Sequence, residues 1–168
     1  NSPVCESTTL TFNITNTAAA GTTFRWIGPN GFNTTTKNPS ISNAPVAATG
    51  RYYVYDTSSA GCYSSDSIDA VVTGKPVIAS TVATPPTTCN SADGGVKLFG
   101  LAPSTTYTVT YSRNGAAPAS TSLTTDILGS LALSGLNTGN YNIYVTSPIG
   151  CASSAVSTTV SSPLSPAA

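Results

Sequence analysis

Apolar and polar residues alternate with a period of two along most of the chain, and this pattern predicts β-strands. In the stretch TTLTFNIT, the apolar side chains of Leu10, Phe12 and Ile14 are separated by polar ones. The same alternation recurs at Phe24 and Trp26, at Ile68, Ala70 and Val72, at Val96 and Leu98, at Tyr107, Val109 and Tyr111, at Leu131 and Leu133, and at Val156, Thr158 and Val160. Successive side chains of a strand point to opposite faces, so each run offers one face to a core. No stretch of ten residues shows a helical period, and the predicted fold class is all-β.

One plan occurs twice in the chain. Residues 50–65, GRYYVYDTSSAGCYSS, align without a gap with residues 139–154, GNYNIYVTSPIGCASS. Upstream, SPVC at 2–5 corresponds to PTTC at 86–89. Such self-similarity at a fixed distance indicates two modules of the same design.

The boundary between the modules falls at Gly74-Lys75-Pro76, where one strand pattern ends and another begins. We therefore expect a first module at 1–74 and a second at 75–163. Residues 164–168 follow a second proline boundary, and we expect them to start a further linker or a disordered tail. A linker this short, with a proline, limits hinge motion.

Each module contains several short strands separated by turn signals, which is typical of a β-sandwich. Gly50-Arg51-Tyr52 and Gly139-Asn140-Tyr141 each open a late strand, as the corner tyrosine of an immunoglobulin-like domain does. We expect Tyr52 and Tyr141 to be corner residues, and Trp26 to pack in the core of the first module.

The stretch WIGPNGF, residues 26–32, allows two interpretations. It contains the only tryptophan of the chain, and with Phe32 it would suit the tip of a binding site. Its central Gly-Pro-Asn-Gly also suits a type I turn followed by a left-handed glycine. The corresponding stretch in the second module, SRNGAAP at 112–118, keeps Asn-Gly but has no aromatic residue. We therefore expect a hairpin with a core anchor.

The four cysteines, Cys5, Cys62, Cys89 and Cys151, allow three pairings. Only the pairs Cys5–Cys62 and Cys89–Cys151 respect the repeat, and we expect these two bridges. Each bridge would tie the entry of a module to its last hairpin and stabilise it by about 4 kcal/mol in the chain-entropy model. The alternative is a set of four free, buried thiols.

The composition of the chain disfavours several classes of partner. Charged residues make up only 7% of the chain, and six Lys and Arg balance six Asp and Glu. A net charge of zero favours neither nucleic acid nor an anionic membrane as a partner. No apolar run approaches the roughly 20 residues that span a bilayer. The chain starts at Asn without a signal-peptide pattern, and we interpret it as a mature segment or fragment. Its even cysteine count favours an oxidising compartment.

Catalysis is disfavoured because the chain has no histidine, which excludes Ser-His-Asp and Cys-His arrangements. The candidate carboxylates for a glycosidase pair are Glu6, Asp56, Asp66, Asp69, Asp93 and Asp126, and they are scattered over strand ends and turns. We expect no enzyme, no metal centre and no cofactor. Calcium at SADGG (91–95), or at Asp66 and Asp69, would have few acidic ligands, and a plain turn at Asp93-Gly94 is the favoured alternative.

Carbohydrate binding would require exposed aromatic side chains. Tyr53 and Tyr55 alternate with the core face of their strand, and with Tyr63 and Phe32 they are the candidate glycan contacts. The alternative for these four residues is cross-strand packing or cover over the edge of the sandwich.

Longer motifs resemble a known type of repeat. SPVCESTTLTF, WIGPNGF, NPSISN and GRYYV followed by GC resemble one repeat, and TTCNSADGGVKLFGLAPSTTYTVTYSRNG and LSGLNTGNYNIYVT followed by GC resemble a second. The two repeats that these motifs resemble are immunoglobulin-like repeats of giant Bacteroidetes cell-surface adhesins, including the SprB-type gliding-motility adhesin. The resemblance covers nearly the whole chain and implies an exported surface filament that touches the substratum. Asp66-Ser67-Ile68 also resembles a Bacteroidetes O-glycosylation site, with Ser67 as the acceptor.

We therefore predict two tandem immunoglobulin-like β-sandwich modules, each with one intradomain disulfide. They would form a non-catalytic stalk or spacer of an extracellular adhesin on a bacterial cell surface, active in adhesion and gliding motility. Its partners would be neighbouring repeats of the same chain and surface polysaccharide or substratum, without nucleic acid or membrane insertion. As a fragment it would be a monomer of roughly 70–80 Å, from two sandwiches in series. The alternative is a carbohydrate-binding or accessory module of a secreted Bacteroidetes protein.

Overall fold

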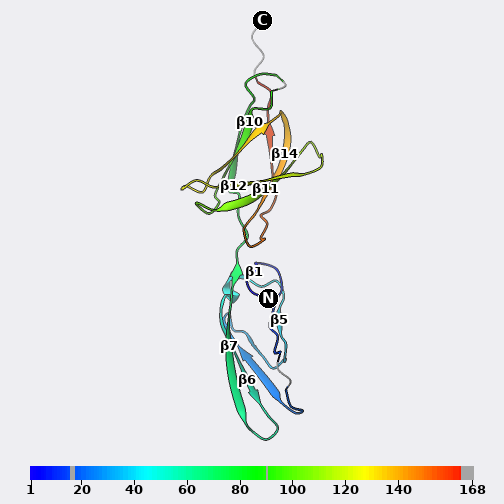
Figure 1. The fold of residues 1–168 in the computed structure, drawn as a ribbon, viewed down its shortest axis with the longest axis vertical. Helices are drawn as coiled ribbons and strands as arrows, with labels where there is room; N and C mark the ends of the chain where they lie inside the picture. The colour runs from blue at the N-terminus through cyan, green and yellow to red at the C-terminus, as the bar shows by residue number, and fades with distance from the viewer. Residues whose placement is uncertain (16–17, 90, 164–168) are drawn as a thin grey trace. The chain divides into compact units, whose positions relative to one another are not determined.

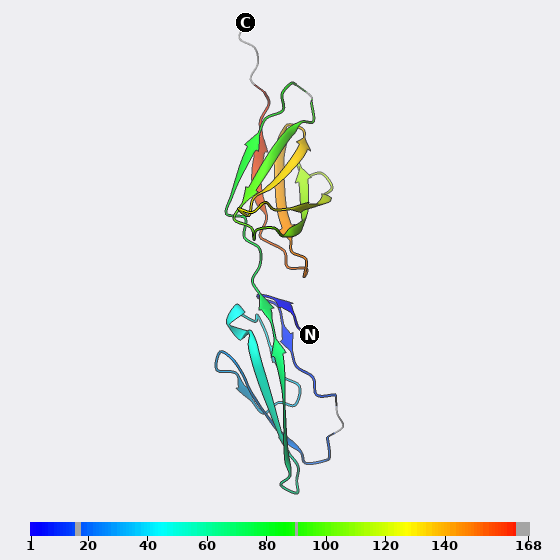
Figure 2. The ribbon, with the colours of Figure 1, turned by 60° about the vertical axis from the view of Figure 1, so that its left-hand side comes forward.

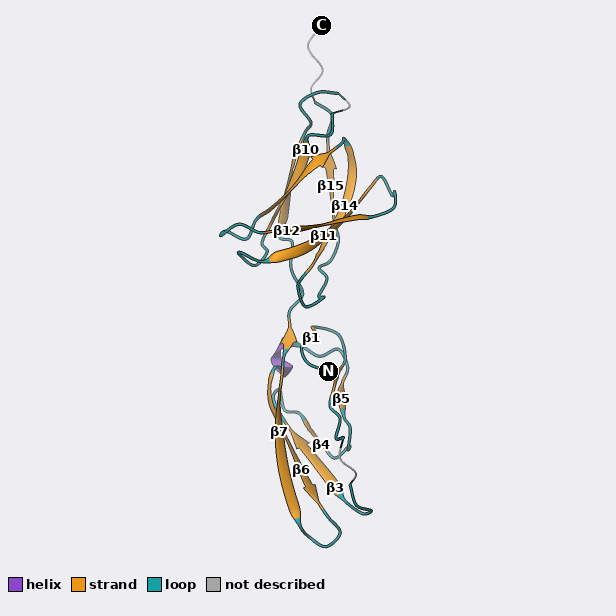
Figure 3. Ribbon diagram, viewed as in Figure 1, coloured by secondary structure: helices purple, strands orange, loops and turns teal. Residues whose placement is uncertain are grey.

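The chain divides into two compact units, Asn1–Gly74 and Lys75–Ala168, in a computed structural model (Figure 1). The structure describes residues 1–15, 18–89 and 91–163, so the tail expected at 164–168 lies outside the described residues. Strands account for nearly all regular structure, and the one helix in these ranges is a short 3-10 turn, η1 (Val46–Ala48) (Figure 3). The all-β prediction is confirmed.

Unit 1 has one large sheet and much smaller strands facing it. The large antiparallel sheet has the order β4 (Asn33–Thr34), β3 (Thr23–Ile27), β6 (Gly50–Thr57) and β7 (Tyr63–Ala70). The short pairs are antiparallel β2 (Leu10–Thr11) with β5 (Ser40–Ile41), and parallel β1 (Val4–Cys5) with β8 (Val72–Thr73). Figure 2 shows the long β6 and β7 beside the short strands near the N-terminus.

The core of unit 1 is small and largely aromatic. Its fully buried members are Leu10, Phe12, Trp26, Ala44, Ala48, Tyr52, Ala70 and Val72. The ring of Phe12 lies 5.3 Å from that of Trp26 and 4.4 Å from that of Tyr52, measured between centroids. These rings join the β2 side of the sandwich to β3 and β6, and tilted aromatic pairs of this kind add to the stabilisation from burial.

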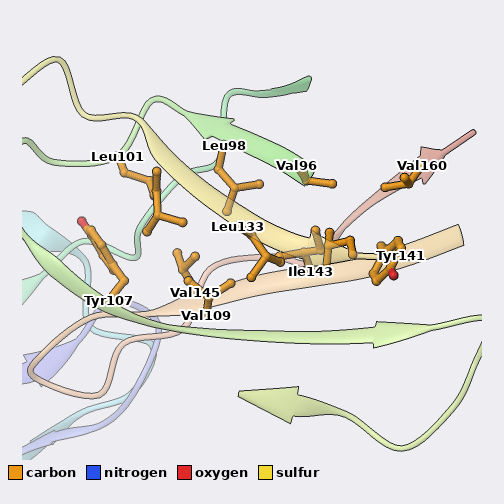
Figure 4. Close-up of a cluster of buried hydrophobic side chains, with 12 residues drawn as sticks. Val96, Leu98, Leu101, Tyr107, Val109, Leu133, Tyr141, Ile143, Val145 and Val160 are labelled. Atoms are coloured by element: carbon orange, nitrogen blue, oxygen red, sulfur yellow. The ribbon is translucent and has the colours of Figure 1, made fainter. Parts of the chain in front are cut away.

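Unit 2 has two well-developed sheets. One contains β13 (Leu131–Leu136), β10 (Gly94–Phe99) and β9 (Ser80–Thr84), and the other contains β12 (Ala119–Thr124), β11 (Thr106–Arg113), β14 (Gly139–Thr146) and β15 (Val156–Val160). Their facing side chains form an aliphatic core, in which Leu98 of β10 and Val109 of β11 are fully buried (Figure 4). The period-two pattern of the sequence supplies these inward faces.

The disulfide pairing predicted for unit 1 is wrong. Cys62 carries a free, exposed thiol, whereas Cys5 is disulfide-bonded. Cys5 pairs with Thr73 across β1 and β8, and Cys62 immediately precedes the other end of β7. The 8 residues of β7 span roughly 26 Å at about 3.3 Å per residue, and a disulfide requires Cα atoms within about 7 Å. The two cysteines therefore lie at opposite ends of the unit.

The predicted Cys89–Cys151 bridge is wrong for the same reason. Cys89 carries a free, exposed thiol in the loop before β10, and Cys151 is disulfide-bonded. Val160 pairs with Gly139, the first residue of β14, and also lies beside Gly94 at the end of that loop. Cys151 follows the opposite end of β14. The repeat correctly places two cysteines at corresponding positions in each unit. The length of the strands, however, keeps the two cysteines of one unit too far apart to form a disulfide with each other.

Candidate functional site

The outer face of the large sheet in unit 1 carries exposed tyrosines. Tyr53 and Tyr55 alternate along β6 with the core residue Tyr52, and their side chains are 42% and 39% exposed. Tyr63 is 83% exposed and pairs across the strands with Thr57, which lies on the same face of β6. Because residues two apart and directly opposite partners share a face, Tyr53, Tyr55 and Tyr63 point to the same side of the sheet.

A shallow depression lies beside these tyrosines. It has a volume of about 340 Å³ and is lined by Thr23, Phe24, Arg25, Ile27, Tyr55 and Thr57. Arg25 pairs with Tyr55 across β3 and β6, and it belongs to neither salt bridge found within the described residues. The face therefore combines aromatic rings with a guanidinium that has several free donors, which together can stack on a sugar ring and donate to its hydroxyl groups.

An ion pair borders the same face. Arg51 Nε donates to Asp69 Oδ1 at 2.9 Å, and its NH2 group donates to Asp69 Oδ2 at 2.6 Å. These hydrogen bonds raise the pKa of Arg51 and lower the pKa of Asp69, and the mutual charge acts in the same directions. Both side chains are more than half exposed, so the pair contributes little to stability.

Phe32 lies apart from the exposed tyrosines. Its ring is half-buried and meets that of Tyr52 edge-on at 5.4 Å, and it lies 5.9 Å from that of Phe12. Ser67 is exposed on β7 opposite Tyr53, and its backbone N–H donates to the side chain of Asp66 at 2.7 Å. The structure therefore separates Phe32 from the candidate glycan contacts and places Ser67 next to them.

The two corner tyrosines occupy equivalent positions. Tyr52 and Tyr141 are buried, and each hydroxyl donates to a backbone carbonyl four residues upstream, at Ala48 (2.7 Å) and Asn137 (2.9 Å). Burial raises the pKa of both phenols. This hydrogen bond to the chain just upstream is the geometry of a tyrosine corner.

The WIGPNGF stretch forms a tight hairpin turn. Trp26 is 3% exposed, and its indole Nε1 donates to the carbonyl of Lys37 at 3.2 Å. The Gly28 N–H donates to the Phe32 carbonyl at 2.9 Å, and the Phe32 N–H donates to the Pro29 carbonyl at 3.1 Å. Asn30 and Gly31, the two central residues of this turn, both have left-handed φ, 54° and 72°. The expected type I turn is therefore wrong, because its second central residue would need a negative φ; the turn is of type I′. Trp26 is therefore a core residue and does not contribute to an exposed binding tip.

A larger groove on the inner face of the same sheet was not anticipated from the sequence. It has a volume of about 650 Å³, and its walls include Phe24, Trp26, Val54, Asp56, Asp66 and Ile68. On the side facing the sheet it is lined by residues that follow β2, including Ile14 and Ala18. No local signal predicts how far a facing strand extends, so only the packed structure reveals this hollow.

The acidic residues are dispersed. Within the described ranges no group of three or more His, Cys, Asp or Glu side chains is arranged to hold a metal ion. Asp93, in the SADGG stretch, instead accepts hydrogen bonds from the hydroxyls of Ser91 and Thr87 and from the Thr87 N–H. These bonds lower its pKa to about 2. The described chain also contains no helix with the length and apolarity to cross a bilayer.

The two facing sheets, the corner tyrosines and the hairpin turns define an immunoglobulin- or fibronectin-like β-sandwich. Residues 1–76 match the family model described as "Ig-like domain CHU_C associated". No curated protein matches the chain significantly.

Several solved structures are similar to this chain. A chain from the crystal structure of a mouse coronavirus receptor-binding domain complexed with its murine receptor is 15% identical, with a TM-score of 0.50 over 96% of each chain. Murine CEACAM1b is 16% identical, with a TM-score of 0.48 over 95% of this chain and 94% of that one. A segment of two fibronectin type-III domains from chicken tenascin is 16% identical, with a TM-score of 0.41 over 94% of each chain. At these identities the likeness concerns the fold alone.

Proposed function

We propose that this chain is a non-catalytic segment of a large exported cell-surface adhesin. It serves as a spacer that holds a distal binding region away from a bacterial cell, in surface adhesion and gliding motility. The observation that carries this proposal is one immunoglobulin-like design built twice, with the same corner hydrogen bond in both units. A spacer gains length by repeating such a module, and it requires no reactive centre.

Three further features support this function. The match of residues 1–76 to an immunoglobulin-like family model agrees with the resemblance of the whole chain to adhesin repeats. The disulfide-bonded state of Cys5 and Cys151 suits an oxidising, extracellular location. The chain has no histidine, and its acids are dispersed, which disfavours hydrolysis as a function.

Surface labelling tests the location. Antibodies raised against this chain are expected to label intact cells of the producing organism, and brief treatment with an external protease is expected to remove the label. A strain in which the parent gene is deleted serves as the control, and it is expected to adhere and glide less. Labelling that appears only after the cells are permeabilised would contradict the proposal.

The tyrosine face of unit 1 favours glycan binding as a second candidate function. Tyr53, Tyr55 and Tyr63 form an exposed aromatic surface beside Arg25, and such rings stack on the apolar faces of sugars. This function fits either a binding repeat of the adhesin or an accessory module of a secreted protein, with surface polysaccharide as the partner.

Glycan-array binding tests this candidate. Replacement of one stacking ring, Tyr53→Ala or Tyr63→Ala, is expected to weaken binding by roughly tenfold, equivalent to about 1.4 kcal/mol. Tyr144→Ala is the matched control, because Tyr144 is a similarly exposed tyrosine of unit 2 (36%) outside the depression. Absence of binding, or equal loss in the Tyr144 variant, would leave the spacer function alone.

A further inference from the structure

The two units contain the same cysteine-bearing turn. In unit 1, Ser58 N–H donates to the Cys62 carbonyl at 2.8 Å, and Cys62 N–H donates to Ser58 Oγ at 3.2 Å. In unit 2, Ser147 N–H donates to the Cys151 carbonyl at 2.8 Å, and Cys151 N–H donates to Ser147 Oγ at 3.1 Å. The glycine before each cysteine adopts a left-handed φ, 82° in one turn and 88° in the other. The two turns are therefore equivalent in sequence and in hydrogen bonding.

The equivalent cysteines differ in chemical state. Cys151 is disulfide-bonded and only 1% exposed, whereas Cys62 is exposed and free. The cysteines near the entry of each unit show the reverse, because Cys5 is bonded and Cys89 is free and exposed. Cys62 and Cys151 are the turn cysteines, and Cys5 and Cys89 are the entry cysteines. One cysteine of each kind is bonded, and one of each kind is free.

Neither free thiol has a possible partner within its own unit. The only other cysteine of unit 1 is Cys5, and the only other cysteine of unit 2 is Cys151. Both are already bonded, and each lies about one full strand length from the free thiol of its unit. A partner for Cys62 or Cys89 must therefore come from outside that unit.

We propose that Cys62 and Cys89 are the two halves of a disulfide between copies of this pair of units, in which Cys62 of one copy bonds Cys89 of the next. The equivalent turn cysteine, Cys151, is disulfide-bonded, so a cysteine in this turn is able to form a disulfide. The proposal rests on the proposed function only for its oxidising compartment, where exposed thiols are not kept reduced. Because the two halves are different surfaces, the linkage is head-to-tail and can continue from copy to copy unless the copies close into a ring.

The bond forms by two thiol–disulfide exchanges with a small-molecule disulfide such as oxidised glutathione. The Cys62 thiolate attacks one sulfur of oxidised glutathione, which gives a mixed disulfide and releases one glutathione thiolate. The Cys89 thiolate of a second copy then attacks the protein sulfur and releases the second glutathione. Two protein thiols are oxidised, two protons are lost from them, and one oxidised glutathione is reduced to two thiols.

A mixing experiment tests the pairing directly. Cys62→Ser retains only the Cys89 thiol, and Cys89→Ser retains only the Cys62 thiol. In a glutathione redox buffer, an equimolar mixture of the two variants is expected to give a covalent dimer on non-reducing gels, several-fold more abundant than in either variant alone. The unsubstituted protein is expected to form a ladder of dimers and longer oligomers, and the double variant is expected to remain monomeric.

Peptide mapping identifies the bond, and a displaced thiol controls for chance collisions. In a mixture of unlabelled and ¹⁵N-labelled protein, the Cys62–Cys89 peptide pair is expected to carry both labels. A triple variant, Cys62→Ser with Ser65→Cys and Cys89→Ser, moves the free thiol of unit 1 from the turn into β7. When it is mixed with the Cys62→Ser variant, which retains Cys89, no covalent dimer is expected.

Three outcomes would overturn the proposal. The first is a Cys62–Cys89 peptide pair whose two peptides always carry the same isotope. The second is that each single variant alone forms as much dimer as the mixture of the two. The third is that the protein remains monomeric, with its thiols capped by glutathione. Because the oxidant is supplied in the buffer, such a failure leaves the surface location to be judged separately by antibody labelling.

Discussion

At the scale of single residues, the contact between Gly28 and Tyr52 explains much of the WIGPNGF motif. A Cβ atom on Gly28 would lie only 2.2 Å from Cδ1 of Tyr52 and 2.5 Å from Cε1. The Tyr52 ring is held by burial and by its hydroxyl bond to Ala48, so it cannot move away without losing both. The glycine therefore allows the hairpin turn to pack directly against the corner tyrosine.

Gly28→Ala is expected to destabilise unit 1 by about 1–3 kcal/mol, because overpacking in a core displaces side chains. Urea unfolding followed by tryptophan fluorescence measures this, since Trp26 is the only tryptophan and lies in the same core. Gly74→Ala is the control, because its nearest neighbour would lie 3.7 Å from the new Cβ. Equal midpoints for the two variants would contradict the packing argument.

The corner hydroxyls support a second prediction at this scale. Tyr52→Phe and Tyr141→Phe each remove one hydrogen bond to a backbone carbonyl, and each is expected to cost about 0.5–1.5 kcal/mol of unfolding free energy. Tyr144→Phe, at an exposed position on β14, is the matched control. A corner variant as stable as the control would show that water replaces the lost bond.

At the scale of elements, the loop that carries Cys89 is organised by one carboxylate. Asp93 accepts hydrogen bonds from Ser91 and Thr87, which holds its pKa at about 2, below the ordinary value of 3.8. A carboxylate whose pKa is lower in the folded protein than in the unfolded chain stabilises the fold at pH values above the unfolded pKa. That stabilisation is lost as pH falls towards the folded pKa.

Amide exchange tests the role of Asp93. Asp93→Asn is expected to speed exchange of the Thr87 N–H at neutral pH, because the charge-assisted bond to the carboxylate is lost. In the unsubstituted protein the same protection is expected to decrease as pH falls from about 4 towards 2. Asp66→Asn is the control, since Asp66 accepts from Ser67 and not from this loop. Unchanged Thr87 exchange would contradict the assignment.

At the scale of the whole molecule, the spacer function depends on the linker between the units. Gly74-Lys75-Pro76 is short, and its proline restricts the backbone. If the chain acts as a spacer, we expect an extended monomer of roughly 70–80 Å, the length of two sandwiches in series.

Small-angle scattering of the variant with Cys62→Ser and Cys89→Ser measures this length without covalent oligomers. A maximum dimension near that of a single globule of the same mass would contradict the spacer function. Lys75→Gly combined with Pro76→Gly is a useful comparison, because a flexible linker is expected to broaden the distribution of distances.

The sequence by itself determined the all-β class and the strands, because alternation is a local pattern that reports which face of each strand is buried. It also determined the repeat, since Tyr52 and Tyr141 follow the same short motif and donate the same hydrogen bond. The presence of a turn at 28–31 was predictable from Pro29, Asn30 and Gly31, but its type was not, because Asn30 is left-handed as well as Gly31.

Only the tertiary structure decided which cysteines are bonded, because pairing depends on the distance across a folded unit. The spacing along the chain favoured Cys5 with Cys62, yet β7 holds them at opposite ends of the sandwich. It also decided that Phe32 packs half-buried against the core and that Tyr63 lies on the same exposed face as Tyr53 and Tyr55. Burial depends on how far the facing strands extend, and no local pattern contains that information.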